Sequence, residues 1–347
     1  MKILLISPLT KESKGGIAIW TEYYINGCKH INSTCEIVNT ALIGSRLIKG
    51  ISKRNLKDEF VRTKNILKEL SIKLKNNSFD IAHLNTSVGT FGIIRDFLVA
   101  KRISKHNIPI VLHFHCDIPV MVNNKLTRHF LKKILKLSNK NFVLCTNSQK
   151  YLLDSFGATS IKIPNFINEQ SISQKCNTNE HIKTCVFVGR VSKLKGAYEL
   201  FDLSKQFPTI TFNLIGEVSP DIAELKKPSN INLLGKMSNK DVFSQLKESD
   251  VFIFPSHTEG FSVALMESMA CGLPSIVYDV GANADMLEGK GGIVLPFDDS
   301  ANWCEALKKL DNQSMRIEMS NWAFLKVKNN YTTENVMKLI YSHYTSI

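Results

Sequence analysis

The chain alternates short apolar runs with longer amphipathic stretches, and this alternation constrains its fold more than any other feature. In the first half the apolar runs are KILLIS, CEIVNT, FDIAHLN, IPIVLHF and FVLCTNS, at residues 2–7, 35–40, 79–85, 108–114 and 142–148. Stretches with helical spacing lie between several of them, for example at residues 16–28 and 56–75. Short apolar runs separated by amphipathic helices are typical of buried parallel strands in βαβ units.

The alternation restarts after a polar, aperiodic segment at residues 164–181, which we interpret as a linker. Six more apolar runs follow, at residues 184–190, 211–217, 231–235, 250–256, 274–279 and 291–296. We therefore predict an α/β fold of two Rossmann-like, doubly wound domains that face each other across a cleft, spanning residues 1–165 and 166–331. Residues 332–347 open with a Thr-Thr-Glu capping pattern and predict a final helix that packs back on the first domain.

The net charge of +13 is unevenly distributed over the 347 residues. Residues 1–165 carry 26 Lys and Arg against 10 Asp and Glu, or +16, whereas residues 166–347 carry 18 against 21, or −3. Such an excess predicts an anionic partner for the first half. Few aromatic residues interleave the basic runs and no nucleic-acid motif is present, so an anionic membrane surface is favoured over nucleic acid.

Neither a signal peptide nor a spanning helix is indicated, because no run approaches the roughly 18 to 20 apolar residues that crossing a bilayer needs. We expect a cytoplasmic protein that binds peripherally to the inner face of the cell membrane. The eight cysteines form no CxxC pair, so neither a zinc site nor a disulfide framework is predicted.

The segment NKLTRHFLKKILKLSNK at residues 124–140 combines apolar and basic side chains at helical spacing. Two interpretations stay open. The segment is either an amphipathic helix on an anionic membrane surface, or a core-packed helix with a solvated basic face. A second basic patch, at residues 46–57, favours the membrane interpretation.

Two features of the first half follow predicted strands. Gly15 and Gly16 open a helix, where their backbone N–H groups either face an anion or simply form a tight turn. In VLHFHCD, strand alternation places His113 and His115 on the same side. No third metal ligand is evident nearby, so His115, nearest the strand end, is a candidate active-site residue rather than a metal ligand.

The second half carries two stronger motifs after strands. In FVGRVSKLKG, residues 187–196, Arg190 and Lys195 flank a turn that opens a helix, a suitable place for a diphosphate. In HTEGFSVALMES, residues 257–268, Glu259 lies in a loop and Glu267 in the first turns of a helix. A carboxylate there is suited to accept hydrogen bonds from ribose hydroxyls, and the helix N-terminus favours an anion.

Together these motifs resemble the large retaining glycosyltransferase family usually numbered four, which has the GT-B fold. The resemblance rests on Gly-Gly at 15–16, HFH at 113–115, GRVSKLKG at 189–196 and EGFSVALME at 259–267, and it continues through CGLPSIV and GANADML to residue 287. It covers essentially the full chain. It implies that the second domain holds a nucleotide-sugar donor and the first holds the acceptor, with no metal or cofactor in catalysis.

Carried over residue by residue, the resemblance assigns Arg190 and Lys195 to the donor diphosphate and Glu267 to the ribose hydroxyls. Glu259 binds hydroxyls of the transferred sugar, and His115 contacts that sugar near the reacting centre. The implied catalytic residues are therefore His115, Glu259, Arg190 and Lys195. Further donor contacts are implied for Gly15, Gly16, Gly189, Gly216, Glu217, Lys236, Met237, Gly260, Phe261 and Ser262.

The resemblance implies transfer of a hexose-type sugar, with retention, from a UDP-sugar or, next in order, GDP-mannose. The acceptor is a glycan or a lipid-linked glycan in the synthesis of cell-surface polysaccharide, such as O-antigen or capsule. No carboxylate is placed as a nucleophile, so front-face attack is favoured over the carboxylate pair of glycosidases. Two alternatives stay open: a nucleotide-sugar epimerase of the same fold, and an inactive sugar-nucleotide-binding subunit.

Overall fold

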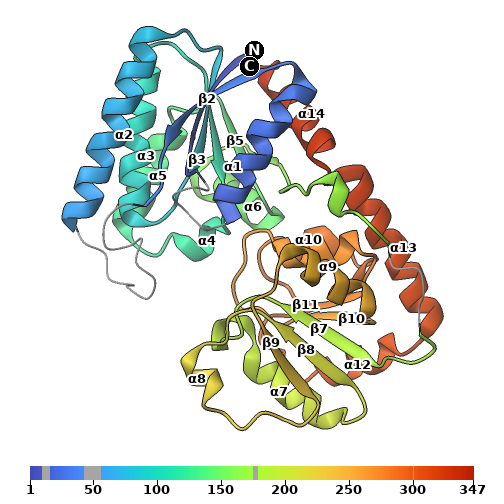
Figure 1. Cartoon of the computed structure of the whole chain (residues 1–347). Coiled ribbons are helices and arrows are strands. Elements are labelled where there is room, and N and C mark those ends of the chain that lie inside the picture. Colours follow the sequence, from blue (N-terminus) through green and yellow to red (C-terminus); the bar gives the residue numbers. More distant parts are fainter. Residues whose placement is uncertain (10–15, 43–55, 175–178, 300) are drawn as a thin grey trace. The chain divides into compact units, whose positions relative to one another are not determined.

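The computed structural model describes residues 1–9, 16–42, 56–174, 179–299 and 301–347. The chain divides into two compact units (Figure 1). The first comprises Met1–Phe166 together with Thr333–Ile347, and the second comprises Ile167–Thr332. These bounds lie one residue from the predicted ones.

The first unit contains a parallel sheet with the strand order β2-β1-β3-β4-β5-β6. Its strands are β1 (Lys2–Ser7), β2 (Thr34–Asn39), β3 (Ile81–Thr86), β4 (Ile110–Phe114), β5 (Lys140–Val143) and β6 (Ile161–Lys162). Its α-helices are α1 (Gly16–Gly27), α2 (Leu56–Asn76), α3 (Thr90–Ser104), α4 (Ile118–Met121), α5 (Lys125–Leu135), α6 (Thr146–Phe156) and α14 (Thr333–Tyr344). All residues of β3 and β4 are buried, which explains why these strands read as near-continuous apolar runs.

Helices cover both faces of this sheet (Figure 1). Leu4 and Ile6 of β1 lie in a core cluster with residues of α2, α3 and α5, whereas Ile3 and Leu5 lie in a second cluster with residues of α1 and α14. The C-terminal helix therefore packs within the first unit. Its Tyr344 hydroxyl lies 2.7 Å from the hydroxyl of Tyr24 on α1, and both side chains are buried.

The second unit contains another parallel sheet, with the order β12-β11-β10-β7-β8-β9. Its strands are β7 (Thr184–Val188), β8 (Thr211–Ile215), β9 (Ile231–Gly235), β10 (Val251–Phe254), β11 (Ser275–Tyr278) and β12 (Gly292–Leu295). Its α-helices are α7 (Ala197–Gln206), α8 (Pro220–Ala223), α9 (Asn239–Glu248), α10 (Val263–Ala270), α11 (Asn283–Leu287), α12 (Trp303–Leu310) and α13 (Gln313–Asn330). The prediction of two Rossmann-like α/β domains is confirmed, since both strand orders are those of doubly wound sheets.

One local prediction is wrong, and one open alternative is decided. The run FVLCTNS does not continue as a strand to residue 148, because β5 ends at Val143 and α6 begins at Thr146. Cys145 caps that helix, its sulfur accepting a hydrogen bond from the Ser148 amide. In the segment 124–140, Leu131 and Ile134 of α5 are fully buried and Phe130 packs against the core, whereas Leu126 is 48% exposed. The packing favours a core-packed helix with a solvated basic face.

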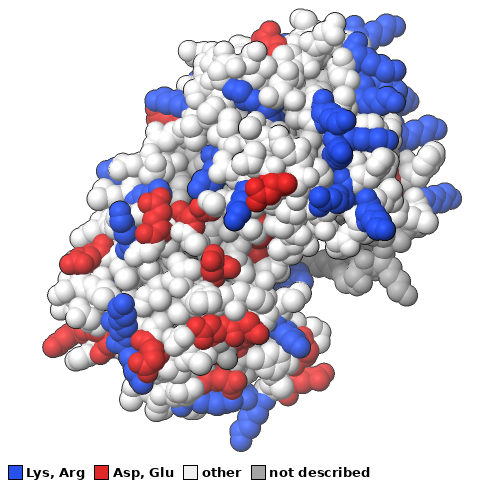
Figure 2. Space-filling view, turned by 180° about the vertical axis from the view of Figure 1, so that it is seen from behind, with Lys and Arg blue, Asp and Glu red and all other residues white. Residues whose placement is uncertain are grey.

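Basic side chains gather over one side of the first unit, at the upper right in Figure 2, with few acidic ones among them. Exposed members from three helices are Lys57, Lys64, Lys68 and Lys75 of α2, Lys101 and Arg102 of α3, and Lys125, Arg128, Lys132 and Lys133 of α5. The predicted basic patch at residues 46–57 lies largely outside the described residues. Within the described part of the chain, no helix combines the length and the apolar character that a membrane span needs.

Candidate functional site

Three loops of the second unit meet at the carboxyl ends of neighbouring strands. They follow β7, β8 and β10, and they comprise residues 189–196, 216–219 and 255–262. The sheet order places β8 on one side of β7 and β10 on the other, so strand addition changes direction at β7. Doubly wound sheets bind ligands at such a switch point.

Two glycines allow these loops to approach one another. A Cβ on Gly216 would lie 1.9 Å from the carbonyl oxygen of Gly189, and the Gly189 amide donates to Ile215 at 2.9 Å. Gly196 has a φ of +79°, and a Cβ there would lie 2.2 Å from the carbonyl oxygen of Pro255. Any larger residue would separate the loop after β7 from its neighbours.

Lys195 and Glu259 form an ion pair between the loops that follow β7 and β10. The Lys195 ammonium lies 2.5 Å from Glu259 Oε1 and also donates to the Thr258 carbonyl at 3.2 Å. Ser256 donates to the same carboxylate oxygen at 2.8 Å. Arg190 is exposed and makes no ion pair with any described residue. The structure thus brings Lys195 and Glu259 together and leaves the Arg190 guanidinium available.

The side chains of the loop at residues 260–262 hold it in place, and its backbone amides are available to a ligand. Phe261 is buried with its ring 5.6 Å from that of Tyr331, and Ser262 donates to Asn283 at 2.6 Å. Their side chains are therefore structural rather than available to a ligand. The amides of Gly260 and Phe261 donate no hydrogen bond to any described residue, and α10 begins directly after them. These groups suit an anionic or hydroxyl-rich ligand.

Glu267 lies on α10 and differs sharply from Glu259. Its side chain is largely buried, and its carboxylate makes no hydrogen bond or ion pair with any described residue. Burial alone raises the pKa of Glu267 from its ordinary value of 4.5 to about 7. A carboxylate with little access to water and no described partner is unfavourable in the free protein, and it is a strong acceptor for a ligand's hydroxyl groups.

The residues predicted to line a base pocket lie at the ends of β8 and β9. Gly216 and Glu217 follow β8, and Lys236 and Met237 follow β9. Lys236 forms an exposed ion pair with Glu217 at 2.8 Å, and Met237 is half-buried. The structure brings these residues to the same sheet edge as Arg190 and Lys195.

In the first unit His115 directly follows β4 and stacks on His113 with a ring separation of 4.0 Å, as the alternation predicts. Its Nε2 lies 3.0 Å from Asn85 Oδ1 at the end of β3. Burial lowers the pKa of His115 to about 3, so the imidazole is neutral at pH 7. Gly16 begins α1, whereas Gly15 lies outside the described residues.

The residues that surround His115 were not among those predicted. His83 on β3 lies 3.2 Å from His113, nitrogen to nitrogen, and burial lowers its pKa to about 3. Trp20 of α1 packs against both of these rings and against His115. A signal was present, because a histidine and an asparagine at positions 83 and 85 repeat the two-residue spacing of His113 and His115.

No group of three or more His, Cys, Asp or Glu side chains in the described part of the chain is arranged to hold a metal ion. His83, His113 and His115 of the first unit pack as rings against one another and against Trp20.

Known proteins resemble the chain in sequence and in fold. Residues 182–313 match the family model described as Glycosyl transferases group 1. A Klebsiella pneumoniae protein, the uncharacterized 41.2 kDa protein in the cps region, is 28% identical over 65% of this chain and 68% of its own. The 2-deoxystreptamine N-acetyl-D-glucosaminyltransferase of Niallia circulans is 26% identical over 70% of this chain and 69% of its own.

Two solved structures share the whole fold. Sucrose-phosphate synthase of Thermosynechococcus elongatus superposes with a TM-score of 0.79 at 15% identity, covering 99% of this chain and 98% of its own. The Anabaena protein HepE, crystallised with UDP, superposes with a TM-score of 0.75 at 14% identity over 100% of both chains. The two doubly wound units have the GT-B fold. The match of the second unit and the named relatives make the group 1 glycosyltransferases the family that the chain resembles.

Proposed function

We propose that this glycosyltransferase moves a hexose-type sugar from a nucleoside-diphosphate sugar to a glycan or lipid-linked acceptor with retention of configuration, as members of family four do. The observation that carries the proposal is the pair of unlike glutamates beside two cations. Glu259 is paired with Lys195, whereas Glu267 is unpaired and largely buried. A UDP-sugar is favoured over GDP-mannose, and the fold shared with a UDP-bound protein supports a uridine donor.

Each residue has a role that follows from its surroundings. Arg190, exposed and without an ion pair to any described residue, joins Lys195 in neutralising the diphosphate. Glu267 accepts hydrogen bonds from the ribose hydroxyls, which replace the water that burial has removed. Glu259 holds hydroxyls of the transferred sugar, with the amides of Gly260 and Phe261 beside it. Gly216, Glu217, Lys236 and Met237 border the base.

The reaction proceeds by front-face attack without a metal ion or another cofactor. The bond between the anomeric carbon and the diphosphate oxygen breaks first, and Lys195 and Arg190 stabilise the negative charge that grows on the diphosphate. The acceptor hydroxyl then attacks the same face of the oxocarbenium-like sugar, and the leaving phosphate oxygen takes its proton. His115, neutral because of burial, contributes hydrogen bonds near the anomeric carbon rather than charge.

The biological setting belongs to the proposal as well. The Klebsiella relative is named for a cps region, which supports a role in cell-surface polysaccharide synthesis such as capsule or O-antigen. The basic side of the first unit favours an anionic membrane surface at the inner face of the cell membrane as a partner, and not nucleic acid.

A thermal-shift screen of nucleoside diphosphates and their sugars tests the donor site. A ligand at about 100 times its dissociation constant adds roughly 2.7 kcal/mol to the free energy of unfolding. UDP and UDP-sugars are expected to raise the melting temperature most, with and without a chelator. If no nucleoside diphosphate shifts it, the donor site is refuted. Conversion of a UDP-sugar to its epimer without any acceptor would instead identify an epimerase.

A further inference from the structure

A polar cavity lies at the switch point of the first unit's own sheet. It has a volume of about 200 Å³ and is bordered by chain that follows β1, β2 and β3. Strand addition changes direction between β1 and β3, so this is the place where such a sheet binds a ligand. Its polar walls are Thr40, Glu59, Arg62, Asn85, Thr86 and Arg95.

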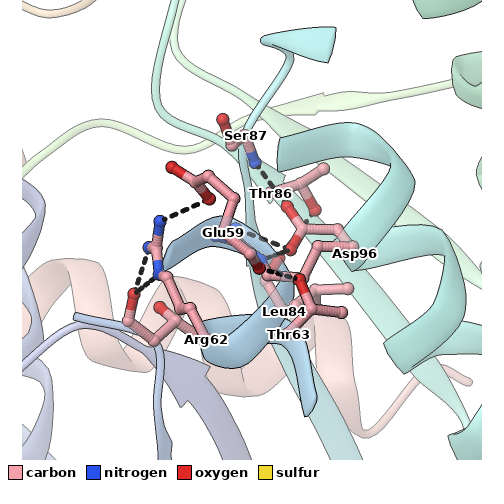
Figure 3. A network of polar contacts seen from close by, with 9 residues as sticks. Glu59, Arg62, Thr63, Leu84, Thr86, Ser87 and Asp96 are labelled. Atoms are coloured by element: carbon pink, nitrogen blue, oxygen red, sulfur yellow. Dashed lines mark hydrogen bonds and ion pairs between the residues drawn. The ribbon is translucent and has the colours of Figure 1, made fainter. Parts of the chain in front are cut away.

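Polar contacts hold the charged side chains around this cavity, and Figure 3 shows part of the network. Arg95 pairs with the fully buried Asp96 at 2.7 Å, and Asp96 also accepts the Ser87 amide at 2.8 Å. Arg62 lies 3.4 Å from Glu59 and donates to the Thr40 carbonyl. Arg95 is paired with Asp96, which is fully buried and does not line the cavity, and Arg62 is paired with Glu59, so the lining arginines present hydrogen-bonding edges that are already partnered by carboxylates. Such a lining suits a head group rich in hydroxyls.

An apolar groove of about 490 Å³ adjoins the cavity between α2 and α3. Glu59, Phe91 and Arg95 line both, so the two spaces share a wall. The groove's floor and rims are largely aliphatic and aromatic. Phe60 is 73% exposed and Leu56 is 65% exposed on α2, which is unusual for such large apolar side chains on one helix.

The geometry points to an amphiphilic acceptor: a lipid-linked saccharide whose apolar chain lies between α2 and α3 and whose hydroxyl-bearing head enters the polar cavity. A free oligosaccharide would leave Phe60 and Leu56 in water. The lipid source is favoured by position, because α2 and α3, which line the groove, carry the exposed Lys64, Lys68 and Lys101, and Figure 2 shows basic side chains gathered on one side of the first unit.

The cavity also leads to the residue placed nearest the reacting sugar. Asn85 forms part of its wall, and its Oδ1 accepts a hydrogen bond from His115 Nε2 at 3.0 Å. A head group in the cavity is therefore separated from His115 only by the side chain of Asn85. The inference rests on the proposed function, because it names the acceptor class of that same reaction.

A homologous series of n-alkyl β-D-glucosides with six, seven and eight carbons, each below its micellar concentration, probes the groove in the full-length protein. Each methylene that enters an apolar site contributes about 0.8 kcal/mol, so affinity is expected to tighten about fourfold per carbon. Isothermal titration measures the dissociation constants, and UDP binding is measured on the same samples.

Two exposed residues of the groove offer variants that do not disturb the core: Phe60→Gln combined with Leu98→Gln. Ile72→Gln combined with Leu153→Gln is the matched control, since these side chains are 52% and 53% exposed and do not line the groove. The chain-length dependence is expected to vanish in the groove variant and to persist in the control. An affinity independent of chain length, or an equal loss in both variants, overturns the inference.

The outcomes also separate this inference from the donor proposal. UDP binding without a chain-length effect rejects the lipid groove alone. A chain-length effect without UDP binding rejects the donor site alone. Binding of the protein to phosphatidylcholine–phosphatidylglycerol vesicles, without any response to monomeric glucosides, would assign the apolar side chains to the bilayer instead and would also overturn the inference.

Discussion

Replacing Glu267 with glutamine removes a charge that the fold keeps away from water. The pKa of this carboxyl rises from 4.5 to about 7 on folding, because burial penalises the charged form. That difference corresponds to about 3 kcal/mol, and we expect about 2 kcal/mol because the carboxylate keeps some of its water. The replacement preserves shape and hydrogen-bonding capacity and removes only the charge.

The sign follows from proton linkage. Because the folded state binds the proton more tightly, the wild-type chain loses stability as the pH rises from about 4.5 through about 7, relative to the variant. Glu267→Gln should therefore match the wild type near pH 4 and exceed it at pH 8. At about 2–4 °C per kcal/mol, the variant should melt roughly 5 °C higher at pH 8.

The same carboxylate should make nucleotide binding dependent on pH. Ribose hydroxyls donate to the charged form, so UDP affinity should increase about tenfold between pH 6 and pH 8 in the wild type as the ionised fraction rises. Glu267→Gln should bind UDP more weakly at pH 8 and lose this extra dependence, while titration of UDP itself affects both proteins equally. Calorimetric titrations at the two pH values make the comparison. A stability difference that does not change with pH, or a variant less stable than the wild type at pH 8, refutes the reasoning.

Three further predictions concern the remaining site residues. Glu259→Gln should lower turnover between about tenfold and a hundredfold, as expected for the loss of a charged hydrogen bond to the sugar. Steady-state rates measure this loss. UDP affinity, measured in parallel, should be retained because the freed Lys195 still binds the diphosphate. His115→Gln should slow turnover without weakening UDP binding. The dependence of the rate on pH between 5 and 8 should keep the wild-type profile, because the pKa of His115 is about 3. A profile that changes shape would contradict a neutral imidazole. Asn85→Ala should reproduce part of that loss, since it removes the 3.0 Å contact to His115, and an unchanged rate would count against the contact.

Much of the fold could be predicted because buried parallel strands appear in the sequence as short apolar runs. The segments IPIVLHF and DVFIFPS correspond to β4 and β10, and the residue after each strand falls at the edge where ligands bind. The positions of His115, Arg190 and Glu259 followed from this rule together with the family resemblance. Local chemistry set the limits, as at FVLCTNS, where Cys145 caps a helix and ends an apolar run that has no sequence break.

Other features depend on contacts that spacing does not encode. The sequence of α5 is compatible with binding to a membrane surface and with packing against the protein core. The burial of Leu131 and Ile134 shows that the helix packs against the core. The sequence predicts that Phe261 is a loop residue beside a ligand, but its ring packs on Tyr331, seventy positions away in the sequence. Likewise, the ion pair of Lys195 and Glu259 joins two motifs that the sequence presents separately.

That ion pair implies an order of events at the donor site. In the free chain Lys195 is neutralised by Glu259, so Arg190 is the cation that can attract a diphosphate from solution. As the diphosphate arrives, Lys195 gains a second anionic partner. Glu259 can then accept hydrogen bonds from the sugar hydroxyls. Glu267 has no such partner to exchange and gains hydrogen bonds only from the ligand. The two glutamates thus serve different steps: Glu259 holds the free site together, and Glu267 makes the free site less stable than the occupied one.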